Sequence, residues 1–161
     1  MEQKNITPIE KVRKIIPYLF KLSKRDLERR LKDEKITLSP LAIFVLRQLE
    51  KESCTIAVIS DKMTLSAATL VPVIDSLEKI KMIHRKKDPV DRRMTNLLIT
   101  EKGREIVKNT NTIIKENKMA KCLSILGEKK VKMLASLLED LAEEMTEGDN
   151  KKEAVLRIYR L

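Results

Sequence analysis

Residues that build turn-rich or aromatic architectures are scarce in this chain. Its 161 residues include no tryptophan, two tyrosines, two phenylalanines, three glycines and five prolines. Few glycines and prolines disfavour the many tight turns of an all-β fold, whereas hydrophobic residues still make up 42% of the chain. We therefore expect a mainly α-helical protein with an aliphatic core.

Long apolar runs and catalytic motifs are also absent. No stretch approaches the roughly 18 consecutive apolar residues of a membrane-spanning helix, and residues 1–8 lack the apolar segment of a secretory signal. The single histidine, His84, has no partner at a metal-ligand or catalytic spacing, and no glycine-rich phosphate loop is present. We expect a cytoplasmic protein that is not an enzyme, needs no cofactor or metal and binds no membrane.

The charge is strongly positive. The 34 lysines and arginines outnumber the 24 aspartates and glutamates, which gives a formal net charge of +10. Such a charge attracts polyanions, among them DNA and RNA. An RNA-binding or chromatin-like protein would need aromatic stacking platforms, for which two tyrosines and two phenylalanines are too few.

Apolar spacing and capping residues predict the first helices. Apolar residues recur every three or four positions over residues 9–31, a helix that Pro17 should kink or split. Ser39 and Pro40 have the chemistry of an N-cap and a first helical residue. The apolar face of this second helix comprises Leu41, Ile43, Phe44, Leu46 and Leu49.

A helix-turn-helix and a hairpin follow. Thr55 opens a third helix, and residues 64–66 link it to a fourth, whose apolar stripe is Leu70, Ile74 and Leu77. Two helices joined by so short a link are the core of a helix-turn-helix. Residues 82–87 and 94–99 then predict two strands around a charged tip, and a hairpin in this position is a wing. Beyond the N-cap Thr100 the chain is predicted helical to about residue 146, with a break at Gly127.

Residues 55–103 resemble the winged helix of the MarR (multiple-antibiotic-resistance regulator) family. The matching segments are Ser66-Ala67-Ala68-Thr69-Leu70 and Ile74-Asp75-Ser76-Leu77-Glu78 in the fourth helix, Asp88-Pro89-Val90-Asp91-Arg92-Arg93 in the hairpin, and Leu98-Ile99-Thr100-Glu101-Lys102-Gly103 after it. The resemblance implies a winged helix-turn-helix over residues 39–100, flanked by dimerisation helices in residues 1–38 and 101–161. The amphipathic segment 153–161 has two open roles, at the dimer interface or against the winged helix.

The resemblance implies a sequence-specific transcription regulator, favoured as a repressor, that binds a pseudo-palindromic double-stranded operator as a homodimer. The recognition helix, about residues 66–80, would enter the major groove, and the wing, residues 88–94, the minor groove. Arg93 is the favoured minor-groove residue, with Arg92 or the basic strand on phosphate. Asp88 and Asp91 would structure the wing, Asp91 by pairing with a neighbouring arginine.

Helical phase selects the DNA-facing side of the recognition helix. A rotation of about 100° per residue places Ala68, Pro72, Asp75 and Lys79 opposite the apolar stripe. This face lacks the Arg, Asn and Gln that read G and A, so contacts with thymine methyl groups and an A·T-leaning site are expected. The residues predicted to contact DNA are Ser66, Ala68, Thr69, Pro72, Ser76, Lys79, Arg85, Lys86, Lys87, Arg92 and Arg93.

Two departures from the family pattern affect the recognition helix. Lys81 occupies the position at its end where the family usually has a glycine, so it accepts a left-handed backbone or the helix ends differently. Pro72 lies inside the helix, where it removes a backbone hydrogen bond, and a kink or widened turn around residues 68–72 is expected.

Alternative roles remain open at this point. The family implies a small aromatic or phenolic effector, for which Arg13, Lys14 and Tyr18 on the first helix are candidate ligands. Cys54 or Cys122 would serve a redox sensor, although small buried hydrophobes are the favoured reading of both. A winged helix that binds protein instead of DNA is the further alternative, and the basic wing argues against it.

Overall fold

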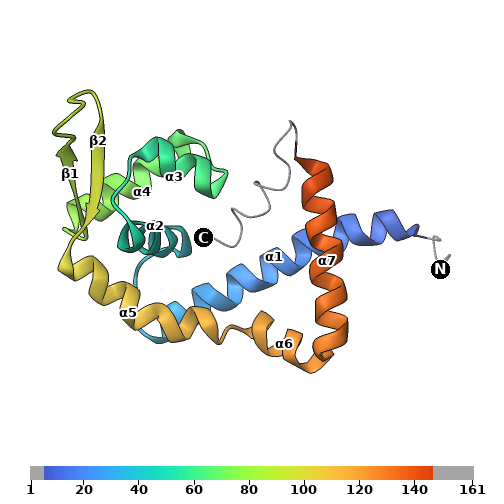
Figure 1. The fold of residues 1–161 in the computed structure, drawn as a ribbon. Coiled ribbons are helices and arrows are strands. Elements are labelled where there is room, and N and C mark those ends of the chain that lie inside the picture. The colour runs from blue at the N-terminus through green and yellow to red at the C-terminus, as the bar shows by residue number, and fades with distance from the viewer. Residues whose placement is uncertain (1–5, 147–161) are drawn as a thin grey trace.

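A winged-helix body and a group of extended helices lie at opposite ends of the molecule (Figure 1). The computed structural model describes residues 6–146, so the predicted segment 153–161 lies outside the described residues. The helices are α1 (Pro8–Asp33), α2 (Pro40–Lys51), α3 (Ile56–Met63), α4 (Ala67–Lys79), α5 (Glu101–Lys115), α6 (Lys118–Leu126) and α7 (Glu128–Met145), and the strands are β1 (Ile83–Lys87) and β2 (Thr95–Ile99). The mainly helical fold with one hairpin is as predicted.

The predicted N-caps are confirmed. Ser39, Thr55, Ser66 and Thr100 each precede a helix, and each side-chain oxygen accepts a hydrogen bond from the backbone N–H three residues later. These bonds are 3.2–3.3 Å long. Capping depends on neighbours in the sequence alone, which is why the four helix starts could be read directly.

The first helix is longer and less interrupted than predicted. It begins with a capping box between Thr7 and Glu10, in which each side chain bonds the other residue's backbone N–H. Pro17 lies within α1 without splitting it. Of the two predicted outcomes the split is therefore wrong, and the kink stays a prediction. The side chains around the proline are exposed, and an exposed helix can accommodate the lost backbone bond with solvent.

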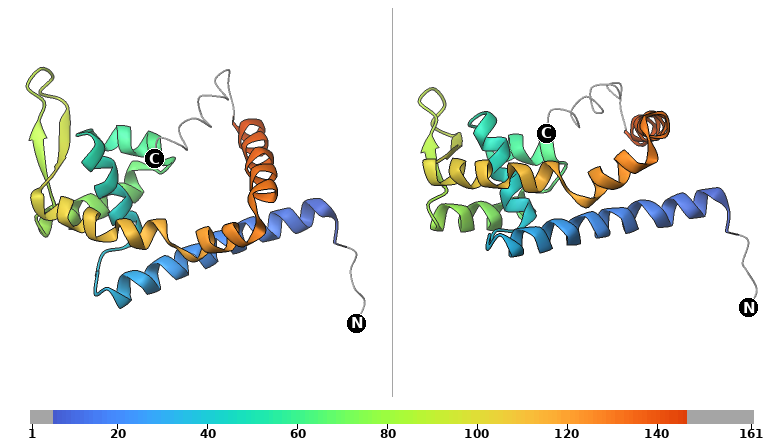
Figure 2. Two further views of the ribbon diagram at one scale, coloured as in Figure 1. Left: turned by 60° about the horizontal axis from the view of Figure 1, so that its bottom comes forward. Right: turned by 90° about the horizontal axis from the view of Figure 1, so that it is seen from below.

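The region after the wing contains one more break than predicted. Gly127 separates α6 from α7 with a φ of 82°, as expected of a residue without a side chain. A second break divides α5 from α6, where Asn117 acts as an N-cap and accepts a hydrogen bond from the Ala120 N–H at 2.9 Å. Figure 2 shows α7 standing apart from α1, with α6 leading toward it.

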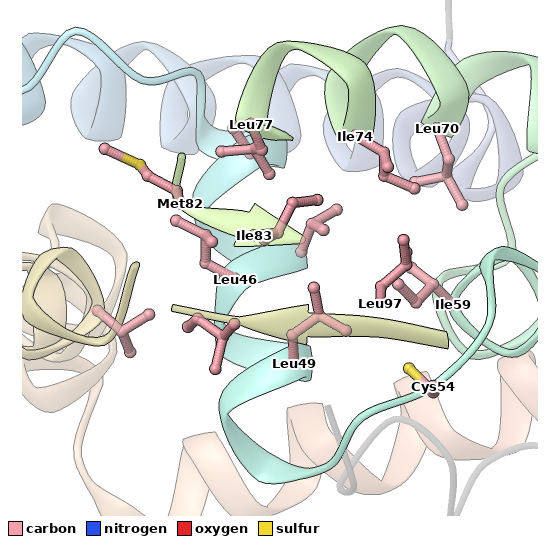
Figure 3. Close-up of a cluster of buried hydrophobic side chains, with 14 residues drawn as sticks. Leu46, Leu49, Cys54, Ile59, Leu70, Ile74, Leu77, Met82, Ile83 and Leu97 are labelled. Carbon is pink, nitrogen blue, oxygen red and sulfur yellow. The ribbon is translucent and has the colours of Figure 1, made fainter. Parts of the chain in front are cut away.

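The main core lies between the helices of the body and the hairpin (Figure 3). Leu97 of β2 is fully buried, and its N–H donates to the Cys54 carbonyl at 2.9 Å, which adds a single bridge beside the hairpin. The core side chains include Leu46, Leu49, Ile59, Leu70, Ile74, Leu77, Met82, Ile83 and Val107. Phe44, predicted on the inner face of α2, is 41% exposed, so that prediction is wrong for the described chain.

A second cluster attaches the long helices to the body. Leu31 of α1, Ile43 of α2 and Ile113 of α5 are buried together. Near it, Asp26 of α1 is buried and accepts a hydrogen bond from the Lys118 N–H at 3.0 Å, and Arg30 donates to the Glu116 carbonyl at 2.9 Å. The C-terminal end of α5 is therefore held to α1 by both apolar packing and polar contacts.

Lys81 accepts the strained backbone that the sequence allowed. It follows α4 with a φ of 61°, and its N–H donates to the Glu78 carbonyl at 2.9 Å. A left-handed conformation is costly for a residue with a side chain and free for glycine. The helix therefore ends as the family's glycine would end it, at a cost in stability.

Replacing Lys81 with glycine should relieve this strain. We expect the Lys81→Gly variant to be more stable by roughly 0.5–1 kcal/mol, because Lys81 is exposed and loses no described side-chain contact. Urea unfolding of both proteins measures the change, and Ser76→Gly, at an exposed position inside α4, is a control expected to destabilise by about 0.5 kcal/mol. A destabilised Lys81→Gly variant would contradict the assignment of strain.

Candidate DNA-binding surface

The α3–α4 turn is short and internally hydrogen-bonded. Thr64 ends α3 with a φ of 51°, and the Leu65 N–H donates to the Ser60 carbonyl at 3.0 Å. The Ser60 hydroxyl in turn donates to the Leu65 carbonyl. These reciprocal bonds fix the angle between the two helices, so the start of the recognition helix is set by the turn.

The two faces of α4 differ as the helical phase predicts. Leu70, Ile74 and Leu77 are buried. The outer face carries the predicted contact residues Ser66, Ala68, Thr69, Pro72, Ser76 and Lys79, together with Val71 and Asp75, and all are exposed. Pro72 does not break the helix, which runs over Ala67–Lys79 without a widened turn, and the predicted kink stays a prediction.

Aspartate side chains order the tip of the wing. The Asp88 carboxylate accepts hydrogen bonds from the Val90 and Asp91 N–H groups at 2.9 and 3.0 Å and from the Asn96 side chain at 2.8 Å. The Asp91 carboxylate accepts from the Arg93 N–H at 2.9 Å. Asp91 thus binds the backbone of a neighbouring arginine, and its predicted ion pair with an arginine side chain is not among the described contacts.

The Asp88 contacts also determine its ionisation. Hydrogen bonds from the Asp91 and Val90 N–H groups and from Asn96 lower the pKa of Asp88 below its ordinary value. A lowered folded-state pKa means that the ionised form stabilises the wing above the unfolded pKa, and that this contribution is lost as the pH falls through the folded value. The Asp88 carboxylate is therefore ionised at neutral pH, the form that accepts these three hydrogen bonds. Asn96 was missed in the sequence because its partner is eight residues away.

The predicted basic residues of the wing fall into two groups. Lys86, Lys87, Arg92 and Arg93 are exposed, and no described hydrogen bond or ion pair occupies their charged groups. Arg85 is half-buried and forms ion pairs with Asp75 and Glu78 of α4. The first group is free to meet a polyanion, whereas Arg85 is already engaged within the protein.

The start of α5 contacts the end of α4 through Thr100, Lys102 and Gly103. Lys102 donates to the Ile80 carbonyl at 3.0 Å, and the Thr100 hydroxyl donates to the Lys81 carbonyl at 2.8 Å. Gly103 lies so close to Met82 that a Cβ atom would be 2.4 Å from its carbonyl oxygen. The start of α5 is therefore packed directly against the end of α4.

The structure gives little support to the predicted effector site on α1 or to a redox role for the two cysteines. Arg13, Lys14 and Tyr18 are exposed on α1, and none lines the pocket of about 350 Å³ between α1 and α2, so the effector site stays a prediction. Burial raises the pKa of the Cys54 thiol, which disfavours the reactive thiolate. Cys122 is exposed, contrary to its prediction as a buried hydrophobe.

The described residues offer neither a metal site nor a membrane-spanning helix. Within residues 6–146, no group of three or more His, Cys, Asp or Glu side chains is arranged to hold a metal ion. None of the helices in this range combines the length and apolarity needed to cross a membrane. The exposed face of α4 and the basic wing, by contrast, are features of the described chain that call for a functional explanation.

Comparison with known proteins assigns the family. Residues 38–95 match the model of the MarR family. The chain is 31% identical over 117 residues to the HTH-type transcriptional regulator MhqR of Bacillus subtilis (strain 168), covering 71% of this chain and 79% of that protein. Two solved structures share the fold, the regulator BldR from Sulfolobus solfataricus (20% identity, 89% and 100% coverage, TM-score 0.71) and the repressor CouR bound to a 23-mer DNA duplex (19% identity, 88% and 98% coverage, TM-score 0.70). The chain belongs to the MarR family and is a DNA-binding transcription regulator, not an enzyme.

Proposed function

We propose that this regulator is a homodimeric repressor that places α4 in the major groove and the β1–β2 wing in the minor groove of a pseudo-palindromic operator. The observation that carries the groove assignment is the pairing of two exposed arginines, Arg92 and Arg93, with a tip ordered by Asp88 and Asp91. An arginine in a narrow A·T-rich minor groove gains from the enhanced negative potential there. Repression is supported by CouR, which shares the fold and is described as a transcriptional repressor.

The exposed face of α4 supports an A·T-leaning operator. Ala68, Val71 and Pro72 offer apolar surface that suits thymine methyl groups. Ser66 and Thr69 bond each other through their hydroxyls at 2.8 Å and retain acceptor capacity for phosphate or water. Lys79 is the single cation of this face, so base discrimination rests on methyl contacts and DNA shape.

A homodimer is supported by apolar side chains that the described chain leaves exposed. Ile9, Phe20, Met133, Leu137 and Met145 are each at least 60% exposed. They belong to continuous apolar faces of α1 and α7, which stand at the end of the molecule away from the wing (Figures 1 and 2). Large exposed apolar faces mark interaction sites, and a second copy would cover them symmetrically.

Fluorescence anisotropy across a salt series tests the DNA-binding proposal. Duplexes are first selected from random DNA, and binding to the best one is compared with a random duplex. We expect a preference of at least ~10³-fold, with an A·T-rich core in the selected site. For Arg92→Ala/Arg93→Ala, the slope of log affinity against log salt should be shallower by about 1–2 units for the two wings of a dimer.

A matched variant separates wing contacts from net charge. Lys21→Ala/Arg25→Ala removes the same two charges from the exposed polar side of α1, so its slope should stay close to that of the wild type. A G-rich selected core would contradict the proposed reading by α4. Sequence-blind binding, or a wing variant indistinguishable from the control, would contradict the groove assignment and favour a protein-binding winged helix.

A further inference from the structure

Arg85 differs from the other predicted DNA contacts because its guanidinium is held by the protein itself. Its Nη2 donates to Asp75 Oδ1 at 2.6 Å, and its Nη1 donates to Glu78 Oε2. The backbone N–H of Arg85 donates to the other oxygen of Glu78 at 3.3 Å. Three hydrogen bonds, two of them between full charges, therefore join one residue of β1 to two residues of α4.

The cluster connects the two elements that are to read DNA. Asp75 and Glu78 are three residues apart and share one side of α4, while Arg85 pairs with Leu97 in the hairpin register. The side chains of Arg85, Glu78 and Asp75 are 30%, 36% and 56% exposed, so water screens the Asp75 pair more than the Glu78 pair. The carboxylate of Asp75, followed by that of Glu78, raises the pKa of Arg85, which stays charged at any physiological pH.

We infer that Arg85 is a positioning residue, which sets the angle of the wing against the recognition helix and does not bind phosphate. This inference rests on the proposed function, because it assigns Arg85 a role within that DNA-binding surface. The planar guanidinium fork matches two carboxylates at fixed positions, which a lysine could not do. Asp75 and Glu78 take two of the five guanidinium N–H groups. Because the cluster of one cation and two carboxylates carries a net negative charge, it disfavours the approach of a phosphate.

The chain between α4 and β1 shows why such a brace is useful. Only residues 80–82 separate the two elements, and the Met82 N–H donates to the Leu77 carbonyl at 2.9 Å. These contacts hold the base of the hairpin, whereas Arg85 acts further toward the tip. Because α4 and the wing tip must enter neighbouring grooves together, a change of wing angle costs the specific complex more than a loose, sequence-blind one.

Removal of both carboxylates distinguishes a brace from a phosphate contact. Asp75→Ala/Glu78→Ala takes away the partners of Arg85 and four negative charges per dimer. For a positioning residue we expect affinity for random duplex to rise while the preference for the selected duplex falls about tenfold. For a phosphate contact, the freed Arg85 would strengthen binding to both duplexes in parallel and steepen the salt slope by about 2 units per dimer, which would overturn the inference.

Three further variants complete the experiment. Glu50→Ala/Glu105→Ala removes the same charge from exposed acids of α2 and α5 and should leave the preference unchanged. Arg85→Lys keeps the charge without the fork, so its preference should also fall, whereas a wild-type preference in this variant would contradict the inference. Lys86→Met removes the neighbouring exposed cation and should make the slope shallower by about 1–2 units per dimer. Thermal unfolding verifies that each variant is folded, and absence of any preference in the wild type would refute the proposed function separately.

Discussion

Replacing Gly103 with alanine is expected to destabilise the protein by about 3 kcal/mol. The added Cβ would lie 2.4 Å from the Met82 carbonyl oxygen and 2.6 Å from Cγ1 of Ile99. One of these atoms belongs to the backbone that connects α4 to the wing, and the Thr100 N–H donates to the same carbonyl at 3.0 Å. The clash can be relieved only by moving α5 away from the end of the recognition helix.

The sign of this effect makes the test decisive. Helix propensity alone predicts that alanine at a helical position is more stable than glycine by about 1 kcal/mol, whereas the close approach predicts the opposite. Urea unfolding gives the free energy, and Glu105→Ala on the exposed side of α5 should change it by less than about 0.5 kcal/mol. A stabilised Gly103→Ala protein would show that α5 does not pack as described.

Charges placed on the apolar face of α7 are expected to separate the dimer and reduce operator affinity by about 10²-fold or more. Leu134 and Leu141 are each 39% exposed and lie one above the other on this face. In Leu134→Glu/Leu141→Glu, four carboxylates per dimer would have to be buried without partners. Each released subunit would then hold a half-site alone, without the gain that comes from linking two binding events.

Sedimentation equilibrium and anisotropy together measure this effect. Lys129→Glu/Ser136→Glu introduces charges at the same seven-residue spacing, about 140° away around the helix, and should leave a dimer. A monomeric α7 variant with unchanged half-site binding is the expected pattern. If the α7 variant remains dimeric, the dimer interface does not include this face of α7. A monomeric wild type would contradict the proposed homodimer.

Local chemistry explains which parts of the fold could be predicted. The caps at Ser39, Thr55, Ser66 and Thr100 depend only on neighbouring backbone groups, so they could be predicted from the sequence. The buried stripe of α4 depends only on helical phase and could be predicted as well. Asn117 has equally local capping chemistry, and it was overlooked because continuous helical character masked the break. This helix start could therefore have been predicted from Asn117.

Contacts between distant segments explain the rest. Arg85 looked like one more basic residue of the wing, because its pairing with Asp75 and Glu78 exists only once α4 and β1 are side by side. The closeness of Gly103 to Met82 likewise comes from packing. Phe44 was assigned to the inner face of α2 for its apolar character, but at about 100° per residue it lies roughly 140–160° around the helix from Leu46 and Leu49, and it is exposed.

Helix α5 is held in place at both ends, so it connects the long helices rigidly to the wing. Near its C-terminal end, Arg30 of α1 binds the Glu116 carbonyl, and at its N-terminal end Gly103 touches Met82 beside the wing. Its 15 residues span about 22 Å at the standard helical rise. A rotation of only about 10° at the α1 end would therefore displace the wing end by about 4 Å, more than the length of a hydrogen bond. Small angular changes among the long helices are thus large changes at the DNA.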